Sequence, residues 1–154
     1  VTPLGVERID VLSADQMRGA VLRAVGEADV FIAVAAVADY RPVSASEHKI
    51  KKSGEAGLAL ELVQNPDILA EIASLPNPPF CVGFAAESRN LDEYAQAKRQ
   101  KKRVPLLVGN LIQDGMGGDS NRVVLYDDQG SHPLPAGAKD EVARDIVAHL
   151  ASRL

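Results

Sequence analysis

The chain has 154 residues, of which 46% are hydrophobic and 25% charged, a composition typical of one globular domain. Its 17 Lys and Arg residues against 21 Asp and Glu give a formal charge of −4, which excludes a general binder of nucleic acids or membrane surfaces. The single cysteine, Cys81, excludes an internal disulfide framework and a metal site built on several cysteines. The longest apolar run, 30–38, is shorter than the roughly 20 residues that cross a bilayer, and no signal peptide is visible, so we expect a soluble, cytoplasmic protein.

Hydrophobic periodicity and capping residues predict the first elements of the chain. Residues 6–11 alternate like a short strand, and Ser13 is a good N-cap for a helix over 14–25. The β-branched run 30–34 predicts a strand covered on both faces, and a loop follows over 35–47.

The middle of the chain begins with a predicted strand over 58–63. Asn65 is the expected N-cap of the next helix, with Pro66 at the first helical position and Asp67 facing the positive end of the helix dipole. We expect this helix to end by Ser74.

The remaining pattern continues the alternation of strands and helices. We expect strands over 80–85 and 106–110, a charged helix over 91–103, a loop over 114–121, a β-hairpin of 122–127 and 131–134, and a final helix over 138–154. This order implies a three-layer α/β fold (αβα) with a mainly parallel, Rossmann-like sheet and a C-terminal β-hairpin, in one domain over 1–154.

Small and acidic residues follow the strand predicted at 30–34, and open α/β sheets bind ligands beyond the carboxyl ends of their strands. Ala35 and Ala36 would let a ligand or another chain approach the backbone closely, and Asp39 adds a carboxylate. The alternative is that the alanines pack under a helix and that Asp39 caps a turn.

Two lysine clusters stand out in this acidic chain. Lys49, Lys51 and Lys52 could hold a triphosphate, although a solvated run of charge is the alternative. Lys98 and Lys102 are four residues apart, so they share a helical face and could reach one anion. The helix dipole alone, however, also explains cations at the end of a helix.

Further candidate positions lie at a helix start, a strand end and a loop. Residues 65–68 could offer backbone N–H groups to phosphate, but Asp67 would compete with an anion there, so a helix cap is the alternative. Phe84, in the segment 83–87, suggests a nucleotide-base pocket, and the loop 117–119 could be a lid or a plain connection. Neither a G-x-G-x-x-G nor a Walker sequence occurs.

The sequence lacks several common catalytic and metal-binding motifs. His48, His132 and His149 are scattered and show no metal-ligand spacing, and Cys81 is expected to be packed inside a strand. There is neither a nucleophile elbow nor an H-E-x-x-H motif. Lysine-rich anion binding with a few carboxylates suits phosphoryl or nucleotidyl transfer, in which positioning and charge neutralisation supply most of the catalysis.

Five ordered motifs resemble a known enzyme family over almost the whole chain. They are Ala35–Tyr40 (Ala-Ala-Val-Ala-Asp-Tyr), Lys49–Lys52, Asn65–Ile68, Gly83–Glu87 and Lys98–Lys102. In this order and spacing they resemble bacterial phosphopantothenate–cysteine ligase, the coenzyme A biosynthesis domain often fused behind a flavin-dependent decarboxylase.

The resemblance implies a homodimeric, CTP-dependent ligase. CTP would activate the carboxylate of 4′-phosphopantothenate as an acyl-cytidylate, with Mg²⁺ accompanying the triphosphate, and the amine of cysteine would then attack and release CMP. Lys49 is implied to be catalytic, stabilising charge at the α-phosphate. The residues implied to contact CTP are Asp39, Lys49, Pro66, Asp67, Ile68, Leu69, Phe84, Lys98 and Lys102. Ala35, Ala36 and Asn110 are implied to lie at the substrate site or at the subunit boundary.

Two departures from the family pattern bear on this assignment. The family carries a glycine-rich segment with a functional Asn upstream of the strand near Val6, and no such segment stands in this chain, so we expect an N-terminally truncated, catalytically incomplete ligase domain. Asn110-Leu-Ile112 stands where Asn-Asp-Val is frequent, and Met116 stands where the lid often has an aromatic residue. The alternative functions are a nucleotide-binding or dimerisation module without chemistry of its own, and a dinucleotide oxidoreductase, against which the missing glycine fingerprint counts.

Overall fold

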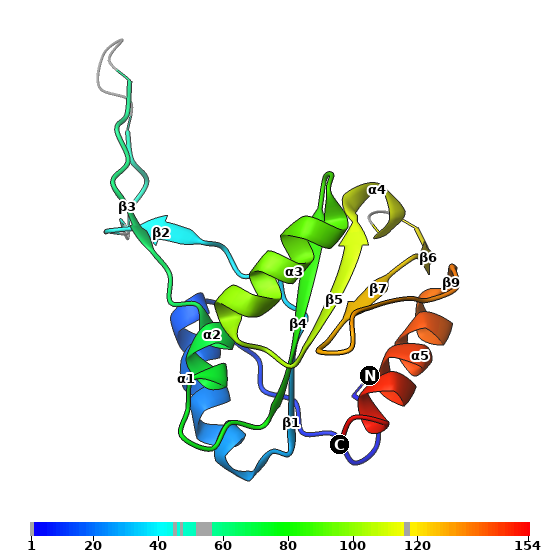
Figure 1. The fold of residues 1–154 in the computed structure, drawn as a ribbon. Coiled ribbons are helices and arrows are strands. Elements are labelled where there is room, and N and C mark those ends of the chain that lie inside the picture. Colours follow the sequence, from blue (N-terminus) through cyan, green and yellow to red (C-terminus); the bar gives the residue numbers. More distant parts are fainter. Residues whose placement is uncertain (1, 45, 47, 52–56, 116–117) are drawn as a thin grey trace.

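A five-stranded sheet forms the centre of the computed structural model, which describes residues 2–44, 46, 48–51, 57–115 and 118–154 (Figure 1). In spatial order its strands are β1 (Val30–Ala33), β4 (Phe80–Glu87), β5 (Leu106–Leu111), β7 (Val124–Tyr126) and β8 (Ser131–Pro133). The first three are parallel, and β7 and β8 add an antiparallel hairpin. The predicted α/β fold, with a mainly parallel sheet and a C-terminal hairpin, is confirmed.

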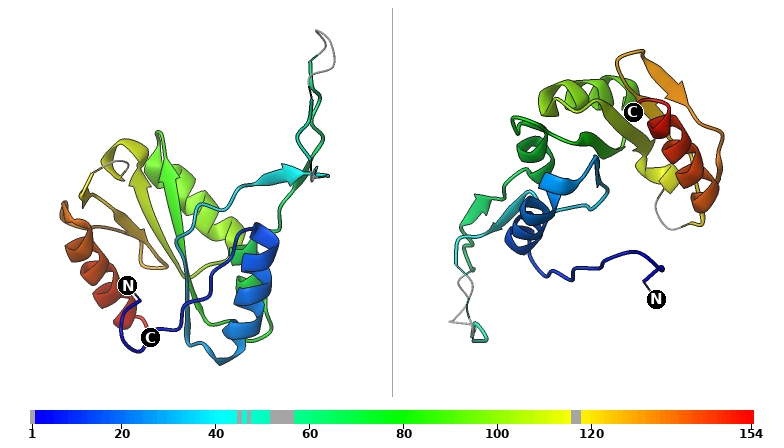
Figure 2. Two further views of the ribbon diagram at one scale, coloured as in Figure 1. Left: turned by 180° about the vertical axis from the view of Figure 1, so that it is seen from behind. Right: turned by 90° about the horizontal axis from the view of Figure 1, so that it is seen from below.

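Helices cover both faces of this sheet (Figure 2). One face carries α1 (Ala14–Ala24), α2 (Ile68–Ala73) and α3 (Leu91–Lys102), and the other carries α5 (Lys139–Ala151). Successive strand residues point to opposite faces, so Cys81 and Ala85 of β4 join the apolar cluster under α1–α3, whereas Val82 joins the cluster under α5. Cys81 is buried, as predicted, and burial raises the pKa of its thiol.

The remaining elements are short. They are η1 (Val25–Glu27), α4 (Ile112–Gly115), and the two-stranded ladder of β6 (Ser120–Asn121) and β9 (Gly137–Ala138). Part of the predicted lid, 116–117, lies outside the described residues. None of the helices in the described ranges is long and apolar enough to cross a membrane.

A narrow arm projects from the sheet between β1 and α2 (Figure 1). It is built on the antiparallel pair β2 (Tyr40–Pro42) and β3 (Leu62–Gln64). The region predicted as a loop over 35–47 therefore contains β2. Of the strand predicted over 58–63, only Leu62 and Val63 are in a strand, β3, which pairs with β2 instead of joining the main sheet. Apolar periodicity indicates a strand but does not say which neighbour it pairs with.

Near the N-terminus, the strand predicted over 30–34 forms as β1, but the strand predicted over 6–11 and the burial of 30–34 on both faces are wrong. Residues 6–11 form no strand, and Val6 and Ile9 are more than half exposed, because no strand of the described chain lies beside them to share a ladder. The strand 30–34 is not covered on both faces: β1 is an edge strand of the described sheet, and Ile32 is 41% and Val34 61% exposed. A continuous apolar run predicts a strand, but whether both of its faces are buried depends on the elements that the fold packs against it.

The N-cap predictions are half right. Ser13 caps α1 by accepting a hydrogen bond from the backbone N–H of Gln16, as predicted. The cap of α2, however, is Asp67 and not Asn65, so Pro66 precedes the helix instead of occupying its first position. Asn65 is used elsewhere, because its side chain holds the loop that follows β1.

Candidate functional site

A cleft of about 580 Å³ lies where β1 ends and α2 begins. This volume is in the range of ligand pockets, and the position beyond the end of a parallel strand is the usual one for ligands of α/β sheets. The cleft residues that the sequence singled out are Ala35, Asp39, Pro66, Asp67, Ile68, Leu69, Phe84 and Lys102. They come from separate segments of the chain, and the fold alone brings them together.

Much of the cleft wall is apolar. Met17 and Val21 of α1 and Phe31 of β1 contribute aliphatic and aromatic surface, and Phe84 of β4 adds a half-buried ring. Ligand pockets commonly combine such a wall with a few placed polar groups. In this cleft the polar groups are Asp39 after β1, Gln64, Asn65 and Asp67 before α2, Lys102 at the end of α3, and Glu7.

Asn65 fixes the loop after β1 to the start of α2. Its Nδ2 donates to the carbonyl of Ala38 at 2.8 Å, and its backbone N–H donates to the carbonyl of Asp39 at 2.7 Å. Its Oδ1 accepts a hydrogen bond from Nη1 of Arg41 at 3.0 Å, and the residue is buried. Satisfied polar groups of this kind make the loop a defined wall of the cleft.

Asp67 and Lys102 form an ion pair at the cleft. Lys102 Nζ donates to Asp67 Oδ2 at 2.7 Å, while Asp67 Oδ1 accepts the backbone N–H of Ala70 at 3.1 Å. Burial alone would raise the pKa of Asp67, but the hydrogen bonds from Lys102 and Ala70 outweigh it and the pKa is lowered. A polyanion entering the cleft would compete with Asp67 for the ammonium of Lys102.

Lys98 has a carboxylate partner of its own. Its Nζ lies 2.6 Å from Oε1 of Glu87, the last residue of β4, in a contact that is ionic without hydrogen-bond geometry. Although Lys98 and Lys102 share one face of α3, the structure pairs them with different carboxylates. Lys98 does not line the cleft.

The other predicted residues lie outside the cleft. Lys49 is exposed on the arm, and Lys52 falls outside the described residues. Ala36 lines a neighbouring hollow of about 440 Å³, which Ala35 shares. Asn110 is half-buried near the end of β5, where its Nδ2 donates to the carbonyl of Leu111 at 3.0 Å.

Sequence reasoning missed two arginines that support this region. Arg41 joins Asn65 to the carbonyl of Gln64, and Arg18 of α1 makes two hydrogen bonds to the carboxylate of Glu71 in α2. Arg18 and Glu71 are 53 residues apart, so no local pattern links them. Both arginines position the elements that frame the cleft.

The lining of the cleft limits its chemistry. Its described residues include no Ser, Thr, Cys, His or Tyr, and its charged groups are carboxylates and one lysine. Covalent catalysis through a hydroxyl, thiol or imidazole of this wall therefore has no candidate in the described ranges. The arrangement is suited to binding and orienting a ligand and to balancing its charge.

The fold and the cleft together define a Rossmann-like α/β domain with a cleft at the position where such sheets usually bind ligands. The model of the family "DNA/pantothenate metabolism flavoprotein C-terminal domain" matches residues 1–154. The chain belongs to this family, and the resemblance that its motifs indicated is confirmed.

Known proteins similar to this chain agree with the family. The coenzyme A biosynthesis bifunctional protein CoaBC of Vibrio cholerae is 43% identical over 154 residues, which are 97% of this chain and 38% of that protein. The crystal structure of the C-terminal domain of CoaBC is 34% identical with a TM-score of 0.75, over 96% of this chain and 66% of that one. A Cab2 mutant in complex with phosphopantothenate-cysteine shares the fold, at 19% identity and a TM-score of 0.61 over 78% of this chain and 43% of that one. This chain thus spans about 38% of the length of the curated relative.

Proposed function

We propose that this chain is the CTP-binding part of a phosphopantothenate–cysteine ligase in coenzyme A biosynthesis. The observation that carries the proposal is the cleft: seven of the nine residues implied to contact CTP line it, namely Asp39, Pro66, Asp67, Ile68, Leu69, Phe84 and Lys102. Similarity to CoaBC proteins supports a role of this chain in coenzyme A biosynthesis. In the full-length protein, a flavin-dependent decarboxylase domain would precede this one.

In the proposed reaction, the carboxylate of 4′-phosphopantothenate attacks the α-phosphorus of CTP and pyrophosphate leaves. The amine of cysteine then attacks the acyl carbon of the cytidylate, and CMP leaves as the amide forms. Lys102 would exchange Asp67 for a phosphate oxygen, and Lys49 on the arm would offset the charge that develops at the α-phosphate. Such charge stabilisation is the main catalytic resource in phosphoryl-type transfers.

Mg²⁺ would enter bound to the triphosphate. Magnesium prefers oxygen ligands and usually joins substrate phosphates to one or two carboxylates. Asp39 fits this preference, because its carboxylate lines the cleft and makes no hydrogen bond or ion pair with other described residues.

Calorimetry on the 154-residue chain with CTP, ATP and NAD in the presence of Mg²⁺ tests the binding proposal. We expect CTP to bind more tightly than ATP and NAD. A preference for NAD would favour an oxidoreductase. Binding of CTP in a full-length protein that releases no pyrophosphate would favour a nucleotide-binding module without chemistry, and no binding of CTP would refute the proposal for this cleft.

Lys49→Gln tests the catalytic role in the full-length protein. We expect pyrophosphate release to fall by about 100-fold or more, the scale for loss of a group that stabilises transition-state charge. The matched control is Lys139→Gln, because Lys139 is an exposed lysine on α5, on the opposite face of the sheet from α1–α3. Unchanged pyrophosphate release by the Lys49 variant would remove this residue from its role.

We also propose that the chain forms a homodimer through the arm. Leu58, Leu60 and Leu62 of the arm are 66%, 64% and 53% exposed, and exposed apolar surface of this kind marks association sites. The expectation of a homodimer comes from the family resemblance.

A further inference from the structure

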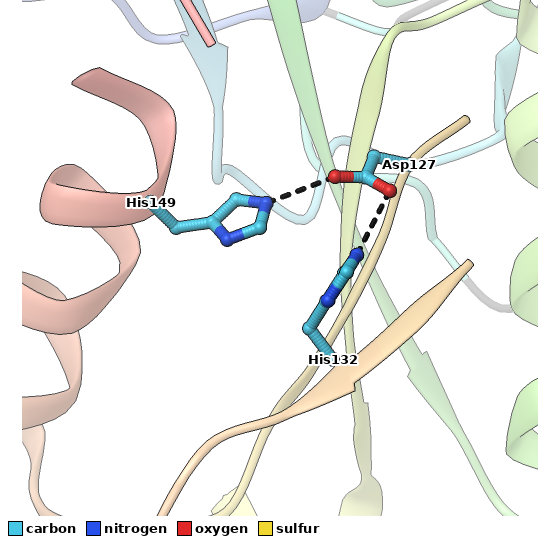
Figure 3. A group of neighbouring side chains, drawn as sticks. All are labelled: Asp127, His132 and His149. Atoms are coloured by element: carbon cyan, nitrogen blue, oxygen red, sulfur yellow. Dashed lines mark hydrogen bonds and ion pairs between the residues drawn. The ribbon is translucent and has the colours of Figure 1, made fainter. Parts of the chain in front are cut away.

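Three side chains that the proposed reaction does not use meet on the α5 side of the sheet (Figure 3). Asp127 follows β7, His132 lies in β8, and His149 lies in the last turn of α5. His132 Nε2 lies 2.9 Å from Asp127 Oδ1, and His149 Nε2 lies 3.0 Å from Asp127 Oδ2. The two imidazole rings are 4.9 Å apart between centroids.

Strand geometry explains this convergence. In the hairpin, His132 is the register partner of Leu125, and Leu125 packs in the apolar cluster under α5. Asp127 is two residues beyond Leu125, so it points to the same face, toward His149. The expectation that the histidines are scattered without metal-ligand spacing is therefore wrong for two of them, because the hairpin register and the docking of α5 supply the proximity that sequence spacing lacks.

The carboxylate of Asp127 is almost completely buried. Only 2% of its side chain is exposed, and Oδ1 also accepts the backbone N–H of Gln129 at 2.8 Å. Burial alone would raise its pKa, but hydrogen bonds from His132, Gln129 and His149 lower the pKa to about 2. The side chains of His132 and His149 are 34% and 19% exposed, so solvent reaches the cluster past the rings.

We propose that Asp127, His132 and His149 form a binding site for a divalent transition metal of the Zn²⁺ class. The site offers one carboxylate oxygen and two imidazole nitrogens, and one ligand atom from each residue lies within 4.8 Å of the others. Two nitrogens and one oxygen suit Zn²⁺ far better than Mg²⁺ or Ca²⁺, which prefer oxygen alone. On metal binding, each ring would give up the hydrogen bond between its Nε2 and Asp127, carry its single proton on Nδ1 and give the lone pair of Nε2 to the metal, and water would complete the coordination.

One cation lies close enough to oppose this site. Arg153 Nε is 3.6 Å from Asp127 Oδ2, but the guanidinium also pairs with Asp128, whose side chain is 72% exposed. Asp128 can therefore keep Arg153 when a metal takes Asp127. Removing the positive charge of Arg153 should therefore tighten metal binding.

The metal would have a structural role. Its ligands come from β7, β8 and α5, so bound metal would tie the C-terminal helix to the hairpin at the edge of the sheet. The cluster shares no residue with the cleft beyond β1. Metal bound there is thus distinct from the Mg²⁺ that would accompany CTP.

The test uses the tag-free chain, stripped of metal with a chelator and titrated with ZnCl₂ against a chromophoric chelator. We expect one Zn²⁺ per chain. His132→Gln and His149→Gln should each lower the affinity by about tenfold or more, as loss of a ligand or its immediate support does. His48→Gln is the matched control, because it removes an exposed histidine of the arm and should leave the affinity unchanged. Arg153→Gln should raise the affinity.

A second measurement does not depend on variants that fold. In the wild-type chain, ¹⁵N NMR of the imidazoles should show Zn²⁺ shifting the Nε2 resonances of His132 and His149 but not those of His48. Zn²⁺ should also raise the melting temperature. Absence of zinc binding, or binding that leaves these two Nε2 resonances unmoved, would overturn the proposal.

Discussion

At the scale of single residues, Asp67 has two partners, and one of them, Lys102, depends on its charge. It caps α2 through the backbone N–H of Ala70 and holds Lys102 of α3 by an ion pair, so one carboxylate joins a helix start to a neighbouring helix at the cleft. Asn65, two residues earlier, ties the preceding loop to the same point. The entrance to the candidate site is therefore held together by polar contacts among a few side chains.

The lowered pKa of Asp67 predicts a pH-dependent contribution to stability. Because the folded-state pKa lies below the unfolded value, the contribution is present above the unfolded pKa and is lost as pH falls through the folded pKa. Asp67→Asn keeps a side chain that can cap the helix but removes the charge, and since 46% of the Asp67 side chain is exposed we expect a loss of at most about 1 kcal/mol near neutral pH. Urea unfolding of both proteins from neutral to acidic pH measures the difference, which should shrink as pH falls. A difference that stays constant across this range would contradict the assignment.

At the scale of secondary-structure elements, β5 depends on a glycine where α3 and β7 approach it. A Cβ at Gly109 would lie 2.9 Å from Cε2 of Tyr126 and 3.0 Å from Cδ1 of Leu91. The Tyr126 ring cannot easily move, because it is fully buried and its hydroxyl donates to Oδ1 of Asp92 at 2.6 Å. Burial also raises the pKa of Tyr126, with the Asp92 hydrogen bond acting in the same direction, so the phenol stays protonated as a donor.

Gly109→Ala should therefore destabilise the fold by about 1–3 kcal/mol, the usual cost of adding a methyl group to a packed core. Gly26→Ala is the control, because a Cβ there meets nothing within 4 Å and should be neutral or slightly stabilising. Equilibrium urea unfolding reports both. Equal urea-unfolding midpoints for the two variants would show that Tyr126 and Leu91 can move to make room for the added methyl group.

At the scale of the whole molecule, the arm carries apolar side chains that stay exposed. Leu58, Leu60 and Leu62 alternate along one branch of it, so in an extended strand they share a face. The main sheet does not cover this face, since β3 pairs only with β2. A second copy of the chain is the partner that we propose.

The double variant Leu60→Glu/Leu62→Glu should turn the dimer into a monomer, because two carboxylates would have to be buried in the interface. Sedimentation velocity at several protein concentrations measures the change. Val147→Glu is a matched control, since Val147 is 54% exposed on α5, away from the arm. A wild-type monomer, or a dimer that the double variant leaves intact, would rule out an interface on the arm.

Local sequence determined most of the element types. Ser13 is an N-cap wherever a helix follows it, and the apolar stretches of β4 and β5 predict buried strands because burial requires continuous apolar side chains. The hairpin predicted from 122–127 and 131–134 likewise forms, as β7 and β8. The order of strands and helices then restricted the topology to an α/β sheet.

The sequence also determined which residues were candidates for the site, because the motifs that resemble the ligase family contain them. It could not determine how those residues are partnered. Asn65 does not cap a helix; its side chain donates a hydrogen bond to the loop after β1. Lys98 and Lys102 form ion pairs with carboxylates from two different segments of the chain. These contacts join residues 27 apart in the chain for Asn65 and Ala38, 11 apart for Lys98 and Glu87 and 35 apart for Lys102 and Asp67, and a local pattern carries no information about them.

The tertiary structure alone decided three features of this protein. It made β1 an edge strand of the described sheet, it paired β3 with β2 outside the main sheet, and it brought His149 from 22 residues along the chain onto Asp127, beside His132. The physical reason is the same in each case. Propensity, capping and periodicity act over one or two turns of chain, whereas strand pairing, burial and ligand geometry are set by which elements pack side by side.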